Sequence, residues 1–180
     1  MIGSVVCGVD GSRDSRLALR TATLLARRLG ERLVVVHVVQ RPVSGHTLGP
    51  AGGHPAPITS ESALLASGQA LIDKILEEEE IIGADGNAIL GFPVETRVVL
   101  GFPAEGLADA ADDEQAELIV VGSRGRGAFK AALLGSVSSD LIGIARCPVL
   151  VVPPGAAAAA AAAAVAVAVG DRSYAAGAHS

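Results

Sequence analysis

The sequence has few basic residues, and they do not cluster. Its 180 residues include 14 lysines and arginines against 19 aspartates and glutamates, which gives a formal net charge of −5 at pH 7. A protein that follows a nucleic acid needs a track of positive side chains along the phosphate backbone. The composition therefore argues against nucleic acid as a partner.

A long hydrophobic run is also missing. The longest apolar stretch, 156–169, consists of alanine and valine, and it is shorter than the ~17–25 residues that a membrane-spanning helix needs. The opening segment, MIGSVVCGVDGS, lacks the basic region and long apolar stretch of a secretory signal. We therefore expect a cytoplasmic protein that does not enter a membrane.

Only two cysteines are present, and neither indicates a disulfide. Cys7 and Cys147 each lie in an apolar run typical of a buried strand, so we expect both to be small core residues in a reducing compartment. His37 likewise lies in an apolar strand and is typical of a core histidine. His46 and His54 share a loop without a third ligand in view, so we expect no metal bound by protein side chains.

Strand and helix patterns alternate along most of the chain. Apolar and β-branched runs predict five strands, at 4–9, 32–39, 94–100, 118–121 and 148–152. Helical spacing of apolar residues predicts four helices, at 13–29, from about 60 to the acidic run 77–80, at 104–115 and at 136–145. Because parallel strands need long crossovers, we predict an α/β fold with one doubly wound, five-stranded parallel sheet and helices on both faces, a Rossmann-like arrangement.

Residues 1–154 form the predicted domain, and 155–180 form a low-complexity tail. Alanine is the best helix former, but a lone helix of this length is marginal in water without packing. We therefore expect the tail to be a frayed helix or a flexible segment. Proline at the start of the fifth strand predicts that this strand lies at the edge of the sheet.

The loop after the fourth strand has the residues of a phosphate site. It contains Gly122, Ser123, Arg124, Gly125, Arg126 and Gly127, and Gly135, Ser136 and Val137 open the last helix. Glycine allows phosphate oxygens to approach backbone N–H groups closely, and the free N–H groups at a helix start favour an anion. In a doubly wound sheet, ligands bind beyond the carboxyl ends of the strands, where the loops after the first and fourth strands meet. The two arginines can add positive charge there or point into solvent.

Two of the candidate site residues have an alternative role. Asp10 precedes the first helix, so it can contact a ligand or act as the helix N-cap. Ser136 at the start of the last helix can donate to a phosphate or can cap that helix without any ligand. Residue spacing alone leaves both alternatives open.

The glycines over 122–136 follow the spacing G-x2-G-x9-G-S, which resembles the nucleotide-binding signature of the universal stress protein family in its ATP-binding branch. Four further segments are similar to that family: VVCGVDGSRDSRLAL, VVVHVV, ETRVVLGFPAEGLADAA, and AELIVVGSRGRG through RCPVLVVP. The resemblance covers about residues 2–153. The loop 41–57, the stretch 84–92 and the alanine tail depart from it.

The resemblance implies an adenine-nucleotide site. Gly8 and Asp10 would lie beside the adenosine, and backbone groups of Val38 would face the adenine edge. Residues 122–127 would line the ribose and phosphates, and residues 135–137 would hold the phosphate tail. The implied cofactor is ATP with Mg²⁺ held mainly by phosphate oxygens, and cyclic AMP is its main competitor.

The motifs of an efficient ATPase are missing. The sequence has no G-x4-G-K-[ST] loop and no second acidic residue that a motif would place beside a water or a cation. The segment 10–15 is a loose echo of the Ser-Gly-Gly-x-Asp-Ser loop of ATP pyrophosphatases, but it lacks the paired glycines. Enzymatic activity stays open, with slow ATP hydrolysis at most.

These observations predict an adenine-nucleotide-binding protein of stress response or signalling. An exposed edge at Val149–Val152 invites strand pairing, and the resemblance implies a homodimer through this strand. One alternative is a cyclic AMP-binding protein of the same fold. Another is a dimeric interaction module that works without nucleotide.

Overall fold

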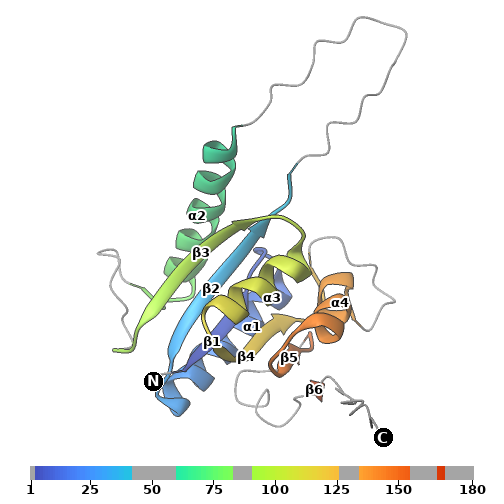
Figure 1. The fold of residues 1–180 in the computed structure, drawn as a ribbon. Helices are drawn as coiled ribbons and strands as arrows, with labels where there is room; N and C mark the ends of the chain where they lie inside the picture. The colour runs from blue at the N-terminus through green and yellow to red at the C-terminus, as the bar shows by residue number, and fades with distance from the viewer. Residues whose placement is uncertain (1–2, 42–59, 83–90, 126–133, 155–165, 169–180) are drawn as a thin grey trace, which may run out of the picture.

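A computed structural model describes residues 3–41, 60–82, 91–125, 134–154 and 166–168. Strands and helices alternate along the chain (Figure 1). The elements are β1 Ser4–Gly8, α1 Arg13–Leu29, β2 Arg32–Val39, α2 Glu61–Glu78, β3 Val94–Leu100, α3 Pro103–Asp113, β4 Ala116–Gly122, α4 Ser136–Ile144, β5 Val149–Val152 and β6 Ala166–Ala168. The predicted α/β fold is confirmed, with element boundaries that agree to within two residues.

The sheet has the strand order β3-β2-β1-β4-β5-β6. β1 to β5 are all parallel, and β6 pairs antiparallel with β5. The chain first moves outward through β2 and β3, then returns to the other side of β1 with β4. The direction of winding therefore reverses between β1 and β4, which is where doubly wound sheets bind ligands beyond the strand ends.

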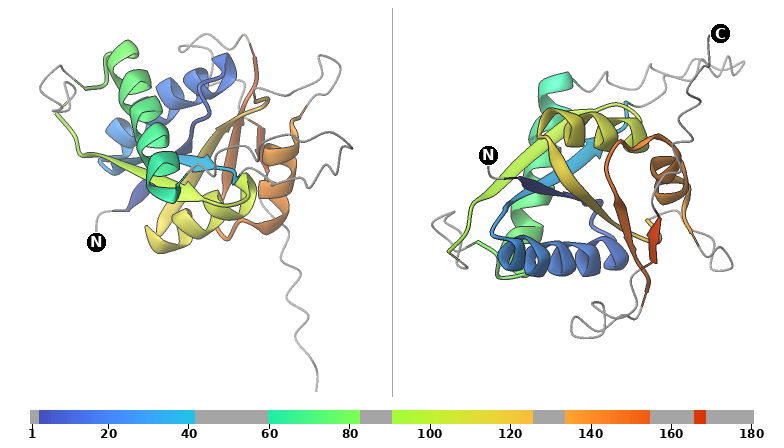
Figure 2. Two further views of the ribbon diagram at one scale, coloured as in Figure 1. Left: turned by 90° about the horizontal axis from the view of Figure 1, so that it is seen from above. Right: turned by 60° about the horizontal axis from the view of Figure 1, so that its bottom comes forward.

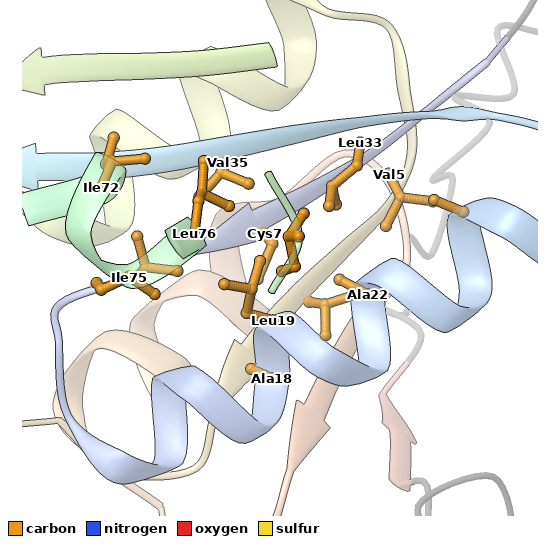
Figure 3. Packing of buried hydrophobic residues seen from close by; sticks show 14 of the residues in the cluster. Val5, Cys7, Ala18, Leu19, Ala22, Leu33, Val35, Ile72, Ile75 and Leu76 are labelled. Atoms are coloured by element: carbon orange, nitrogen blue, oxygen red, sulfur yellow. The ribbon is translucent and has the colours of Figure 1, made fainter. Parts of the chain in front are cut away.

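Helices cover both faces of the sheet, with α1 and α2 on one side and α3 and α4 on the other (Figure 2). Under α1 and α2, side chains such as Leu19, Leu33 and Ile75 pack around Cys7 (Figure 3). A second buried cluster lies under α3 and α4 and includes Leu107 and Leu141. Residues alternate between the two clusters along the inner strands, because successive side chains of a strand point to opposite faces.

The first helix is capped by Ser12 and not by Asp10. The Ser12 hydroxyl accepts a hydrogen bond from the Ser15 N–H at 3.2 Å. Gly11, with a φ of 81°, turns the chain between Asp10 and this cap. This geometry excludes Asp10 as the N-cap. Its Oδ1 atom instead accepts a hydrogen bond of 2.9 Å from the Ser12 N–H.

Two further expectations about the end of the chain are wrong. Cys147 was expected inside a buried strand, but it precedes β5 and is only half-buried, because Pro148 delays the start of the ladder. The fifth strand was expected at the sheet edge, but β6, from the alanine-rich tail, occupies that edge. Apart from residues 166–168, the tail lies outside the described residues.

None of the described helices is both long enough and apolar enough to cross a membrane. Cys7 and Cys147 are both free thiols. Burial raises the pKa of the Cys7 thiol far above its ordinary value, which is the behaviour of a small apolar core residue. The prediction of a core role is therefore confirmed for Cys7.

Candidate functional site

A cleft of about 680 Å³ opens at the carboxyl ends of β1, β2 and β4. Its size lies within the range of ~300–1,000 Å³ typical of small-molecule sites. Its walls come from the β1–α1 loop, the end of β2, the first turns of α3 and α4, and the loop after β4. The cleft therefore lies at the reversal point of the winding.

The structure brings together ten of the twelve residues that the sequence singled out. Gly8, Asp10, Val38, Gly122, Ser123, Arg124, Gly125, Gly135, Ser136 and Val137 all line the cleft. Arg126 and Gly127 lie outside the described residues. Segments more than a hundred residues apart thus converge on one cavity, although their contact with a ligand stays a prediction.

Gly122 and Gly125 allow two loops to meet closely. A Cβ atom at Gly122 would lie 2.6 Å from the carbonyl carbon of Asp14, and one at Gly125 would lie 2.7 Å from Oδ2 of Asp10. Contacts this short are sterically forbidden for backbone atoms, so Gly122 has a packing role besides any role toward a ligand. The Ser123 hydroxyl adds a hydrogen bond of 3.3 Å to Oδ2 of the buried Asp14.

Some amides of the glycine loop already have protein partners. The Ser123 N–H donates to the Val152 carbonyl at 2.9 Å, and the Gly135 N–H donates to the Ser123 carbonyl at 2.6 Å. These two amides are directed into the protein. The predicted role of Gly135 in holding phosphate therefore does not extend to its own N–H, and any anion at this wall would have to bond to the amides of the α4 first turn.

The N-cap of α4 is Gly135, so in the described part of the chain no N-cap side chain bonds to the first-turn amides of this helix. Ser136 is the first helical residue and is exposed at the cleft, which excludes it as the N-cap. The Ser138 hydroxyl instead bonds to the Gly135 carbonyl at 3.0 Å and to the Ser123 carbonyl at 3.3 Å. Among the described residues, the α4 N-terminus thus presents amides and the Ser136 hydroxyl to the cavity.

The other end of the cleft, beside β2 and α3, is more apolar. Pro103 and Leu107 of α3 and Val121 of β4 line it together with Val38. Gly8 forms part of the floor, where a Cβ atom would lie 2.9 Å from Cδ1 of Leu107. The cavity is therefore suited to a molecule with a flat apolar part at β2 and an anionic part at α4.

The peptide group of Val38 faces the cleft. The Val9 N–H donates to the Val36 carbonyl at 2.9 Å, and the Gly101 N–H donates to the Val39 carbonyl at 3.1 Å. Peptide groups alternate in direction along a parallel strand, so the N–H and C=O of Val38 point toward β1, beyond its last residue. Among the described residues, no hydrogen bond joins the Val38 N–H to the Val9 carbonyl.

Several cleft residues were not predicted from the sequence. Ser15, His37, Gln40, Pro103, Leu107, Leu134 and Ser138 also line the cavity. Their place at strand ends and in the first turns of helices was a usable signal for His37, Gln40 and Pro103. For Leu107, in contrast, the sequence position does not reveal that its side of α3 turns toward the cleft. His37 was interpreted as a core residue, but its half-buried ring reaches the cavity wall.

Known proteins support this assignment of the fold. The universal stress protein family model matches residues 1–153. A universal stress protein of Thermus aquaticus is 35% identical over 153 residues, which is 84% of this chain and 99% of that protein. A solved universal stress protein in complex with cAMP has a TM-score of 0.55 and 26% identity, covering 84% of this chain and 97% of the other. The universal stress protein of Archaeoglobus fulgidus in complex with dAMP has a TM-score of 0.53 and 25% identity over 84% of this chain and 97% of that one.

Proposed function

We propose that this chain, which belongs to the universal stress protein family, binds an adenine nucleotide in the cleft between β1, β2, β4 and α4. The observation that carries the proposal is the division of one cavity into an apolar end at β2 and an uncapped helix N-terminus at α4. Two solved relatives hold adenine nucleotides, cAMP in one and dAMP in the other. The protein would then act in stress response or signalling by changing conformation or assembly with bound nucleotide.

The adenine base would lie at the β2 end. The inward-facing peptide of Val38 offers one N–H donor and one C=O acceptor, which match the adenine N1 acceptor and 6-amino donor. Guanine carries an acceptor at position 6, so the same peptide disfavours it. Leu107 and Pro103 would contact the faces of the purine.

The phosphates would lie at the α4 end. Ser136 and Val137 supply amides at the positive end of the helix dipole, and such helix starts bind phosphate readily. The half-buried Arg124 lines the same wall. Ser136 adds a hydroxyl that has no other hydrogen bond among the described residues.

Mg²⁺ would be held mainly by the phosphates. No group of three or more His, Cys, Asp or Glu side chains in the described part of the chain is arranged to hold a metal. Of the residues that the structure describes, Asp10 is the one carboxylate that lines the cleft. Since Mg²⁺ keeps several waters and uses one or two carboxylates with phosphate oxygens, the donor set fits a nucleotide-borne cation.

ATP and cyclic AMP are the two candidate ligands. Cyclic AMP has a single phosphate group, which stays close to the ribose and would leave the first turn of α4 unoccupied. ATP extends far enough to use Ser136 and Val137. We favour ATP because the uncapped α4 N-terminus lies within the same cavity.

The proposal extends to a cytoplasmic homodimer. The two free thiols are what a reducing compartment would maintain. Dimerisation through Val149–Val152 would require the edge that β6 now occupies. If assembly proceeds without ligand, the protein is instead an interaction module, and light scattering with and without ATP distinguishes the two.

Calorimetry with ATP, cyclic AMP, AMP and GTP tests the proposed function. We expect adenine nucleotides to bind and GTP to bind more weakly. A mass spectrum of small molecules released from heat-denatured protein identifies the natural ligand without a prior choice. The absence of heat for every adenine nucleotide, together with an empty spectrum, would refute nucleotide binding.

A further inference from the structure

The side chain of His37 forms a hydrogen bond with the backbone carbonyl of Val9. Its Nδ1 atom lies 2.7 Å from the Val9 oxygen. A backbone carbonyl only accepts hydrogen bonds, so Nδ1 must carry the hydrogen. The imidazole therefore acts as a donor at the point where β1 ends and the cleft begins.

The packing around His37 fixes its ring. A Cβ atom at Gly68 of α2 would lie 3.4 Å from Cδ2 of His37 and 2.5 Å from Cγ1 of Val98. Only a glycine at position 68 lets α2 lie this close to the sheet. The ring is thus held between a helix and the Val9 carbonyl, and its position is defined on both sides.

The bond from His37 replaces a strand contact. The Val9 N–H still pairs with the Val36 carbonyl, as the last rung between β1 and β2. In a regular parallel ladder the Val9 carbonyl would next accept from the Val38 N–H. Here that carbonyl bonds to the imidazole instead, on the α2 side of the sheet.

We infer that His37 is a positioning residue for base recognition: by binding the Val9 carbonyl, it keeps the Val38 peptide open toward the cleft. The inference rests on the proposed nucleotide site and names how that site selects its base. Val9 is almost fully buried, and a buried carbonyl needs a hydrogen-bond partner. Without the imidazole donor, the nearest remaining donor along the ladder is the Val38 N–H itself.

Two variants separate the donor from the bulk of the ring. His37→Phe keeps a ring of similar size without a donor, and His37→Asn keeps an N–H donor close to the position of Nδ1. In His37→Phe we expect the Kd for ATP to rise about tenfold, the effect of one hydrogen bond, with little change for GTP. In His37→Asn we expect the ATP preference over GTP to be retained. His37→Leu replaces His37→Phe if the latter does not fold.

Hydrogen exchange of the Val38 amide gives a readout that needs no nucleotide. We expect this amide to exchange rapidly in the native protein and in His37→Asn, and to become protected in His37→Phe as the ladder gains a rung. The inference would be overturned if His37→Phe kept the native ratio of the Kd values for ATP and GTP. It would also be overturned if His37→Phe and His37→Asn lost equal affinity for ATP. If the native protein binds no adenine nucleotide, the proposed function fails, while the exchange pattern still decides the role of His37.

Discussion

The carboxylate of Asp10 lies against Gly125, so that a Cβ atom at position 125 would stand 2.7 Å from its Oδ2 atom. The other oxygen, Oδ1, accepts a hydrogen bond of 2.9 Å from the Ser12 N–H. The carboxylate is therefore tied to the β1–α1 loop and cannot turn aside without breaking that bond. A side chain at position 125 would disturb both walls of the cleft.

We predict that Gly125→Val abolishes nucleotide binding, because the added side chain displaces Asp10 and fills the approach to the loop amides. Calorimetry with ATP measures the loss. Gly143→Ala is the matched control, since a Cβ atom at Gly143 meets nothing within 4 Å and the residue lies outside the cleft. If Gly125→Val bound ATP with native affinity, the nucleotide site would not lie beside Gly125.

Ser136 and Ser138 are two residues apart and are predicted to differ in their effects. Ser136→Ala should cost about 1.5–3 kcal/mol of ATP-binding free energy if its hydroxyl meets a charged phosphate, with cyclic AMP affected little. Ser138→Ala should instead lower the free energy of unfolding by roughly 0.5–1.5 kcal/mol, since its buried hydroxyl bonds two carbonyls. Calorimetry and urea unfolding of both variants test this division. Equal effects of the two variants on binding would contradict it.

Glu31 directly precedes β2, at the end of the sheet opposite to the cleft, and we expect its charge to destabilise the fold at neutral pH. Burial raises its pKa, and the hydrogen bond and negative charge of Glu117 raise it further. One of its carboxylate oxygens is buried without a hydrogen-bond partner among the described residues. Because the folded protein holds this proton more tightly than the unfolded chain, stability falls as pH rises from the ordinary glutamate range through the folded pKa.

We therefore expect Glu31→Gln to raise the Tm by a few degrees at pH 7, since the amide carries no charge at any pH. The gain should shrink near pH 4, where the native carboxyl is protonated as well. Thermal unfolding across this pH range measures the effect. Glu77→Gln, on an exposed part of α2, is the control and should change the Tm little. A gain independent of pH would rule out the charge as its cause.

β6 and a second copy of the chain would compete for the same edge of β5. Leu150 pairs with Val167 in the present sheet, so a dimer through β5 requires β6 to leave. Amides alternate in direction along a strand, so either Val167→Pro or the pair Ala166→Pro and Ala168→Pro removes the donors that face β5. We expect one of these two variants to shift the mass toward a dimer in sedimentation experiments.

A proline elsewhere in the alanine run, such as Ala158→Pro, is the matched control and should leave the mass unchanged. If the native chain and both β6 variants have the same mass over the same concentration range, β6 does not control assembly through β5. If the control shifts as much as the variants, the effect belongs to the tail as a whole.

The repeating parts of the fold could be predicted from the sequence, because strand and helix periodicity is a local property. The glycine spacing over 122–136 likewise indicated the wall of the cleft between the end of β4 and the start of α4. Details that depend on distant contacts could not be predicted. The packing of Gly122 against Asp14 joins residues more than a hundred positions apart, and the choice of Ser12 over Asp10 as cap depends on the turn at Gly11.

The same limit explains the unexpected residues. The alanine-rich composition of the tail favoured a helix or a flexible segment, although valine and alanine alternate over 165–169, which is the two-residue period of a strand. His37 has the neighbours of a core residue, and only the end of β1 at Gly8 exposes its ring to the cavity.

The floor of the cleft is formed largely by main chain and by glycine, at Gly8, Val38 and Gly122. Recognition that depends on peptide groups is insensitive to most side-chain exchanges, provided that the chain path is preserved. Related proteins could therefore diverge at rim positions such as Gln40 and Leu134 and retain their affinity for the same small molecule.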